Sequence, residues 1–325
     1  METMLTPIRT RLKDETLALA CAVSMRRPGD RKPPRRARSA SCPALTFSTT
    51  VRSIALVRYA LAGFVAAGDF SYSGTLFRQV RMTQTWVNPP SDTPLADGEV
   101  HLWRASLVQT PDALRRLRST LAPDESEKAA RYHFPRDRDH YVAARGLLRR
   151  LLGHYLAQPP QSLRFSYGAY GKPSLADAAG AQDLRFNLSH SHELVIYAFA
   201  RGRDVGVDIE HMRADLAGDD IAERFFSARE VGMLRALPVA ARTRAFFNCW
   251  TRKEAYIKAR GEGLSHPLDA FDVSLTPGEP AALLGTRGDP RELTRWSLHA
   301  LDAGEDYAAA VAVQGTGHAL RLWQL

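Results

Sequence analysis

The sequence predicts an α+β protein with two halves of similar layout, and three observations lead to this fold class. From Glu99 onward, segments with apolar residues at helical spacing are interspersed with short runs that favour strands. The order strand, helices, strands occurs twice, and the two occurrences divide near residues 201–204. The chain has 325 residues, enough for two ordinary domains or one large one, and 45% of them are hydrophobic, so it can bury a sizeable core. We therefore expect subdomains at residues 82–203 and 204–325.

The first half opens with a predicted strand, VHLWRASL. Thr110 followed by Pro111 is the N-cap and first-turn pattern of a helix. The segments PDESEKAARYHF and DRDHYVAARGLLRRLLGHYLA predict two further helices, the second of them long and amphipathic. Two strand–turn–strand patterns follow, LRFSYGAYGKPSL and LRFNLSHSHELVIYAFA.

The second half begins with a predicted strand, VGVDIEHM. Helices are expected at DIAERFF, at SAREVGMLRAL and over residues 239–260, with Gly261 ending the last of them. The remaining apolar runs are separated by Gly and Pro turns and predict strands at FDVSL, WSLHAL, YAAAVAV and LRLWQL.

Residues 1–81 differ in composition from the rest of the chain. They hold 14 Lys and Arg against 5 Asp and Glu, which accounts for the whole net charge of +9, whereas residues 82–325 balance at 30 and 30. Their Arg-, Pro- and Ser-rich part has no helical or strand period, so we expect a disordered leader and an active chain beginning at Met82. Targeting or nucleic-acid binding by the leader is the alternative. The balanced charge elsewhere argues against nucleic-acid binding by the folded part.

Cysteine content and hydropathy narrow the class of protein further. Three cysteines, at positions 21, 42 and 249, give neither a disulfide framework nor a paired metal spacing, and Cys249 is expected to pack in the core. No apolar run reaches the roughly 18–20 residues that a membrane helix needs, and the best candidate, residues 53–68, carries Arg58. We therefore expect a cytoplasmic protein in a reducing compartment that does not span a membrane.

The segment VGVDIE is the first candidate site. Strand side chains alternate between faces, so Val207 and Ile209 point one way while Asp208 and Glu210 point the other. Two adjacent carboxylates repel each other unless a cation neutralises them. Mg²⁺ accepts carboxylate ligands and keeps waters for a phosphate substrate. A half-exposed strand with a solvated acidic face is the alternative.

The helix at residues 239–260 contains the second candidate site. Phe247, Trp250 and Ile257 belong to its apolar face. Glu254 and Lys258 are four residues apart and flank that face. An ordinary surface ion pair is the alternative, but the neighbouring aromatic residues favour a site.

Four further residues are candidates for anion binding. Lys172 lies on a tight turn, where Pro173 holds it extended so that its side chain projects. Ser189 and His190 face apart on a strand and therefore cannot act as nucleophile and base, so hydrogen bonding to an anion is the better use. Arg145, in an otherwise apolar helix, suits phosphate recognition. The alternatives are a solvated turn lysine, a polar turn and a snorkelling arginine.

These motifs occur in the order GKP, FNLSH, VGVDIE, FFS..E and W..KEA.IKA.G.GL, and over residues 100–325 the chain resembles the surfactin-type 4′-phosphopantetheinyl transferases. The resemblance implies a monomeric pseudo-dimer of two similar α/β subdomains with the active site in the cleft between them. It also implies Mg²⁺-dependent transfer of 4′-phosphopantetheine from coenzyme A to a serine of an acyl or peptidyl carrier protein, with release of 3′,5′-adenosine bisphosphate. Carriers of fatty acid biosynthesis and of secondary metabolism are both compatible.

The resemblance also suggests a role for each candidate residue. Glu254 is the candidate base, with a metal-held water as the alternative, and Lys258 would stabilise charge on the leaving phosphate. The implied Mg²⁺ ligands are Asp208, Glu210 and Glu254. The implied coenzyme A contacts are Arg145, Lys172, Ser189, His190 and Lys258. A non-catalytic protein that binds a carrier or coenzyme A on the same fold is the alternative, and the presence of all three acidic positions argues against it.

Overall fold

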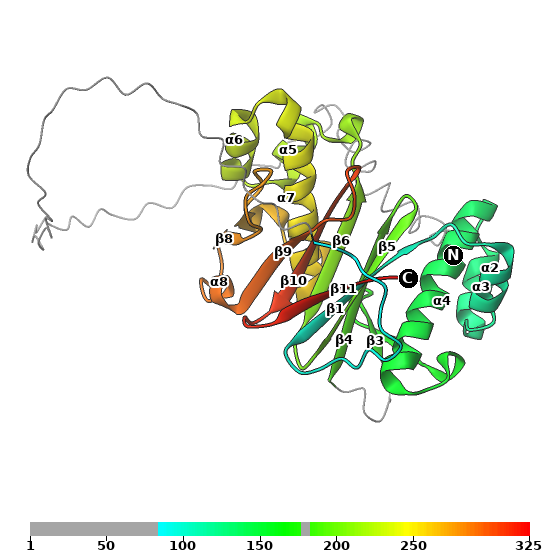
Figure 1. Ribbon diagram of the computed structural model, residues 1–325. Coiled ribbons are helices and arrows are strands. Elements are labelled where there is room, and N and C mark those ends of the chain that lie inside the picture. The colour runs from blue at the N-terminus through cyan, green and yellow to red at the C-terminus, as the bar shows by residue number, and fades with distance from the viewer. Residues whose placement is uncertain (1–83, 177–182) are drawn as a thin grey trace, which may run out of the picture. The chain divides into compact units, whose positions relative to one another are not determined.

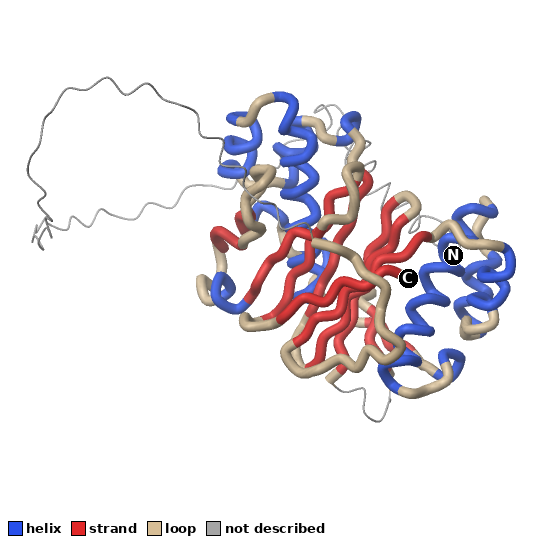
Figure 2. Tube along the Cα trace, in the orientation of Figure 1, coloured by secondary structure: helices blue, strands red, loops and turns tan. Residues whose placement is uncertain are grey.

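The computed structural model describes residues 84–176 and 183–325 (Figure 1). The expected leader at residues 1–81, and the boundary at Met82, lie outside the described residues. Helices and strands are both plentiful along this part of the chain (Figure 2), so the predicted α+β class is confirmed.

The first half is built on a four-stranded sheet with strand order β11-β1-β5-β4. Its strands are β1 (Glu99–Ser106), β4 (Leu184–Ser191), β5 (Leu194–Arg201) and β11 (Ala319–Gln324). Its helices are α2 (Pro111–Arg118), α3 (Pro123–Ala130) and α4 (Pro135–Leu156), with a 3₁₀ turn η1 (Pro160–Ser162) and a hairpin of β2 (Phe165–Tyr167) and β3 (Pro173–Leu175). As predicted, Thr110 caps α2, because its hydroxyl accepts a hydrogen bond from the Ala113 amide at 3.2 Å.

The second half is built on a three-stranded sheet with strand order β6-β10-β9. Its strands are β6 (Val205–His211), β9 (Trp296–Leu301) and β10 (Tyr307–Gln314), with a separate hairpin of β7 (Phe271–Val273) and β8 (Leu283–Thr286). Its helices are α5 (Asp219–Phe225), α6 (Ala228–Ala236), α7 (Val239–Arg260) and α8 (Glu292–Arg295). Three short 3₁₀ turns are η2 (Ala214–Leu216), η3 (Gly263–Ser265) and η4 (Leu268–Ala270).

Side-chain alternation along the strands creates four layers, in the order α4, first sheet, second sheet, α7. On β5, Tyr197 and Phe199 pack towards α4, whereas Ile196 and Ala198 join the core between the sheets. On β10, Ala308, Ala310 and Ala312 pack against α7, while Ala309, Val311 and Val313 face the first sheet. Figure 1 shows α2, α3 and α4 on one side of the sheets and α5, α6 and α7 on the other. Each half thus has one 22-residue helix on its own sheet, as expected for a pseudo-dimer.

Two segments from the ends of the described chain connect the halves. The predicted boundary at residues 203 and 204 falls between β5 and β6, yet the last strand, β11, pairs in parallel with β1 of the first sheet. Near the other end, the Trp86 indole donates to the Asp302 carbonyl, and Val87 forms a bridge with Trp323.

None of the helices in residues 84–176 and 183–325 combines the length and the apolar character that crossing a bilayer requires.

Candidate active site

The two carboxylates of β6 lie on the face of the strand that is turned towards α7. Val207 and Ile209 belong to the core between the sheets, so the alternation expected from the sequence is present. Asp208 is 0% exposed and Glu210 is 6% exposed. The solvated acidic face considered for this strand is therefore wrong. Both carboxylates are buried, and burying them has a cost unless charges or hydrogen bonds compensate it.

A glycine allows α7 to approach this strand closely. A β-carbon added at Gly206 would lie 2.2 Å from the Ala259 nitrogen and 2.3 Å from the Ala255 oxygen, so the two backbones are in contact there. The helix ends as predicted at Gly261, which has φ of 74°. This contact places the carboxylates of β6 beside Glu254 and Lys258, which neighbour Ala255 and Ala259 along the helix.

Lys258 lies among three acidic side chains. Its ammonium forms an ion pair with Asp208, and 19% of its side chain is exposed. Burial lowers the pKa of Lys258, but the charges of Asp208, Glu254 and Glu210 outweigh burial and raise this pKa to about 12. Lys258 is therefore charged at neutral pH. Lys258 contacts Asp208, a buried carboxylate of strand β6. The alternative of an ordinary surface ion pair between Glu254 and Lys258 is therefore wrong.

Ser189 joins this cluster from the other half of the molecule. Its hydroxyl donates to Asp208 Oδ1 at 2.7 Å, and it accepts hydrogen bonds from the Ile209 amide at 3.2 Å and from the Lys258 ammonium at 3.4 Å. His190, half-buried, follows on the opposite face of β4. In the structure Ser189 therefore binds a carboxylate of the cluster, whereas the family resemblance implies a contact with a coenzyme A phosphate.

Lys172 and Arg145 make other contacts. The Lys172 ammonium donates to the Ala259 carbonyl at 2.9 Å and to the Val205 carbonyl at 3.4 Å, so it joins the β2–β3 turn to the last turn of α7. Burial lowers the pKa of Lys172. Arg145 forms an ion pair with Glu125 and donates to the Tyr167 hydroxyl at 2.7 Å. Of the predicted site residues, Asp208, Glu210, Glu254, Lys258 and Ser189 thus gather together, while Lys172 and Arg145 contact backbone or structural partners.

A buried ion pair that the sequence motifs did not predict lies on another side of α7. The ammonium of Lys253 lies 2.8 Å from Glu230 Oε2, and both side chains are 0% exposed. Lys253 also donates to the carbonyls of Leu268 and Phe271, at 2.6 and 2.7 Å. These contacts fix the rotation of α7 about its axis, and hence the direction of the next residue, Glu254. The sequence does contain a signal for this ion pair, because Lys253 lies between apolar positions of the helix.

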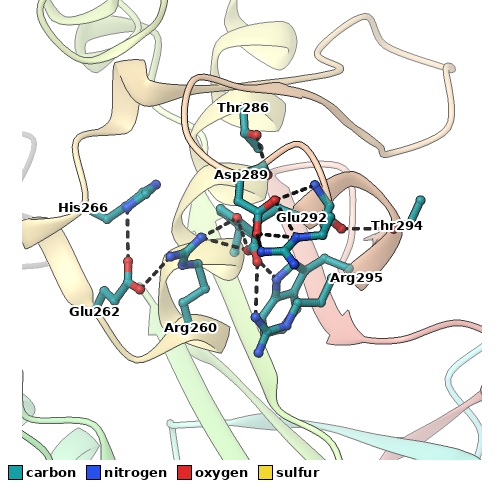
Figure 3. A network of polar contacts seen from close by, with 11 residues as sticks. Arg260, Glu262, His266, Thr286, Asp289, Glu292, Thr294 and Arg295 are labelled. Carbon is teal, nitrogen blue, oxygen red and sulfur yellow. Dashed lines mark hydrogen bonds and ion pairs between the residues drawn. The ribbon is translucent and has the colours of Figure 1, made fainter.

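A second polar network holds the end of α7 and the segment that follows it (Figure 3). The Arg260 guanidinium donates to Glu292 at 2.8 Å and to Glu262 at 2.7 Å, and His266 contacts the other oxygen of Glu262 at 3.1 Å. Glu292 also accepts a hydrogen bond from the Tyr256 hydroxyl at 2.8 Å. Arg260 therefore anchors the end of α7 to α8 and to the segment that follows α7.

The donor set fits a hard divalent cation in chemical type. Asp208, Glu210 and Glu254 provide carboxylate oxygens, which Mg²⁺ prefers, and their charges act together on one point, the Lys258 ammonium. Within residues 84–176 and 183–325, no group of three or more His, Cys, Asp or Glu side chains is arranged as a metal site. In this structure the positive charge among the carboxylates is that of Lys258.

Comparison with known proteins identifies the family. A family model described as the 4′-phosphopantetheinyl transferase superfamily matches residues 204–312, and one described as 4′-phosphopantetheinyl transferase, N-terminal, matches residues 103–201. The chain is 40% identical over 242 residues to 4′-phosphopantetheinyl transferase HetI of Nostoc sp., which covers 74% of this chain and 99% of that relative. This chain belongs to the 4′-phosphopantetheinyl transferase superfamily.

Two further relatives are in the same family. Over 178 residues the chain is 33% identical to a putative 4′-phosphopantetheinyl transferase of Synechocystis sp., covering 55% of this chain and 70% of the relative. It is 36% identical over 160 residues to 4′-phosphopantetheinyl transferase Sfp of Bacillus subtilis, covering 49% of this chain and 69% of the relative. The family and the enzyme class predicted from the motif order are therefore confirmed.

Proposed function

We propose that this chain transfers 4′-phosphopantetheine from coenzyme A to a serine hydroxyl of a carrier protein. The observation that supports this most directly is the gathering of Asp208, Glu210 and Glu254 around Lys258, in a chain of this superfamily. Ser189 brings the other half of the molecule to the same cluster. Catalysis of phosphoryl transfer is mainly positioning and charge neutralisation, and this cluster contains the charged groups for both.

Three carboxylates would repel the pyrophosphate of coenzyme A unless a cation lies between them. We propose that Asp208, Glu210 and Glu254 hold Mg²⁺ for this purpose, because carboxylate oxygens are its usual protein ligands. When bound, Mg²⁺ would supply positive charge to the pyrophosphate oxygens.

The remaining steps use the side chains of this chain. Glu254 accepts the proton of the carrier serine as its oxygen attacks the phosphorus attached to pantetheine. A new bond forms between the serine oxygen and that phosphorus, and the bond to the bridging oxygen of the pyrophosphate breaks. The electron pair leaves with 3′,5′-adenosine bisphosphate. Lys258, which is charged at neutral pH, donates a hydrogen bond to the leaving phosphate as negative charge develops on it.

Lys172, His190 and Arg145 differ in how well their contacts in the structure fit a role in binding coenzyme A. Lys172 faces two backbone carbonyls, which are weaker partners for an ammonium than a phosphate. His190 is half-buried on the face of β4 opposite to Ser189, and we retain it as a proposed coenzyme A contact. Arg145 is the weakest of the proposed anchors because Glu125 and Tyr167 already engage its guanidinium.

The proposed setting is a cytoplasmic monomer that acts on carriers of fatty acid biosynthesis or of secondary metabolism. We propose a monomer because a single chain provides both halves of the site, Ser189 from the first and Asp208 and Lys258 from the second. The cysteine count supports a reducing compartment, and Cys249 is a free, buried thiol in the structure.

The test is incubation of the full chain with coenzyme A, Mg²⁺ and a panel of apo carrier proteins, followed by mass spectrometry of each carrier. We expect a mass gain of one phosphopantetheinyl group on at least one carrier, and its loss when Mg²⁺ is chelated. The matched control is Asp208→Asn, which keeps the side-chain shape but removes a charge. If no carrier gains mass while the chain still binds coenzyme A, the non-catalytic alternative replaces this proposal.

A further inference from the structure

The two sheets meet along a ladder of side chains. β4 is an edge strand of the first sheet and β6 is an edge strand of the second. Three alternate side chains of β4 each accept a hydrogen bond from an alternate amide of β6. The pairs are Asn187 with the Val207 amide at 2.9 Å, Ser189 with the Ile209 amide at 3.2 Å, and Ser191 with the His211 amide at 3.0 Å. The edge of β6 is thus satisfied by side chains of the other half.

Two of the three rungs also hold a carboxylate of the cluster. A serine hydroxyl has one proton and two lone pairs, so when an amide donates to its oxygen, the proton is left for another acceptor. Ser189 donates this proton to Asp208 Oδ1 at 2.7 Å, and Ser191 donates its proton to Glu210 Oε2 at 2.8 Å. The amides of β6 therefore orient both hydroxyls towards the carboxylates.

We infer that Ser191 is a positioning residue for Glu210, so that a strand of the first half sets the metal affinity of carboxylates in the second half. This inference rests on the proposed function, because it assigns Glu210 to a metal. Ser191 is 6% exposed, so water does not readily replace its hydroxyl. Without it, the Glu210 carboxylate loses the hydrogen bond that Ser191 donates to Oε2.

Ser191 gives a cleaner test than Ser189. Ser189 also accepts a hydrogen bond from Lys258, which itself pairs with Asp208, so loss of Ser189 disturbs three charged contacts together. The hydroxyl of Ser191 joins one amide to one carboxylate. Partners that orient a metal ligand contribute about 10- to 100-fold in metal affinity.

Asn187 provides the matched control. It lies on the same face of the same strand and makes the same kind of bond to β6, but its partner is the Val207 amide and no carboxylate of the cluster. Asn187→Ala therefore removes one rung of the ladder and leaves the carboxylate contacts in place. The change in stability of Asn187→Ala measures how much one side-chain hydrogen bond between β4 and β6 contributes to holding the halves together.

The experiment uses Mn²⁺ as the probe, and electron paramagnetic resonance measures free and bound Mn²⁺ in the full chain. We expect Ser191→Ala to weaken Mn²⁺ binding at least about 10-fold and to raise by a similar factor the Mg²⁺ concentration needed for half-maximal transfer, with the rate at saturating Mg²⁺ nearly retained. Ser191→Thr keeps the hydroxyl and should restore both values. Asn187→Ala should lower the melting temperature while keeping the Mn²⁺ affinity of the unmodified chain.

The inference is overturned if Ser191→Ala binds Mn²⁺ normally, if Asn187→Ala weakens binding equally, or if the unmodified chain binds no Mn²⁺. Should Ser191→Ala fail to fold, Ser191→Cys keeps the size of the side chain and provides the same comparison. A chain that binds Mn²⁺ but modifies no carrier would contradict the proposed function alone, because the binding comparison still tests Ser191.

Discussion

Both halves of this molecule bury a cluster of charged side chains that includes residues of a long helix, α4 in the first half and α7 in the second, and the two clusters differ in how their charges balance. In the first half, Glu125 uses one carboxylate oxygen for Arg145 and the other for Arg149. Arg149 also donates to the carbonyls of Pro160 and Leu163, at 2.8 and 3.0 Å. Each charge has an opposite charge or a carbonyl against it, so this cluster holds α3, α4 and η1 together.

In the second half, the corresponding cluster has an excess of acid. Asp208, Glu210 and Glu254 surround the ammonium of Lys258, so the formal charge of the four side chains is −2. Buried like charges repel, and an added cation would relieve the repulsion. The comparison teaches that a buried cluster with balanced charge serves stability in the first half, whereas we assign the acidic cluster of the second half to binding and catalysis.

The largest expected effect is the loss of transfer rate when the acidic cluster is disrupted. Asp208→Asn keeps the size of the side chain but removes one carboxylate charge from the proposed metal site and from Lys258. Transfer to an apo carrier should fall by at least about 100-fold, because preorganised charge is the main source of rate in such sites. Mass spectrometry of the carrier measures the rate. A variant that transfers near the unmodified rate would remove Asp208 from the mechanism.

The matching change in the first half should act on stability instead. Glu125→Gln leaves two buried arginines without their counter-charge, and breaking a buried pair in this way costs roughly 3–5 kcal/mol. Denaturant unfolding measures the loss, and the transfer rate per folded molecule should change little. A stability equal to that of the unmodified chain would show that the arginines find other partners.

Two substitutions separate packing from chemistry on α7. Trp250 is 2% exposed in the core, so Trp250→Ala should cost roughly 3–5 kcal/mol of unfolding free energy and retain the rate of the folded molecules. Glu254→Gln keeps the shape, removes the proposed base and should nearly abolish turnover at near-normal stability. Melting curves and transfer rates measured on both variants check the division. Normal turnover by a poorly stable Glu254→Gln would make Glu254 structural.

The first cluster also predicts a pH dependence of stability. Burial raises the pKa of Glu125, but hydrogen bonds and charges from Arg149 and Arg145 outweigh burial and hold this pKa below its usual 4.5. The contribution to stability is therefore complete above about pH 4.5 and is lost as pH falls through the lowered pKa. The difference in unfolding free energy between the unmodified chain and Glu125→Gln should shrink below that pH. A constant difference down to pH 2.5 would contradict the prediction.

The smallest expected effect concerns the start of the chain. A chain beginning at Met82 keeps Trp86, whose indole binds the Asp302 carbonyl and whose ring lies 5.1 Å from the Arg104 guanidinium. It should unfold and turn over like the full chain. A chain beginning at Pro89 loses these contacts and should be less stable by roughly 1–3 kcal/mol. Equal stability of the two shortened chains would show that residues 82–88 contribute nothing to the junction of the halves.

Local patterns in the sequence were sufficient for most of the elements and for the acidic pair, although they did not predict β8 or α8. The helix at residues 239–260 follows from apolar spacing and from Gly261, and the facing of Asp208 and Glu210 follows from strand alternation. These features depend on neighbours a few residues apart, so spacing encodes them. The order of the motifs then indicated the family, which no single motif could do.

Other features depend on segments far apart in the sequence, and only the tertiary structure reveals them. Ser191 meets Glu210 because two sheet edges run side by side, and Lys253 meets Glu230 because α7 packs across α6 and β7. The last strand, β11, pairs with β1 of the first half. Lys172 illustrates the limit best: its turn was recognised, but its partner is a helix carbonyl 87 residues away. Which buried charge meets which partner is decided by packing, because burial makes an unmet polar group costly and only the folded chain brings the available partners within reach.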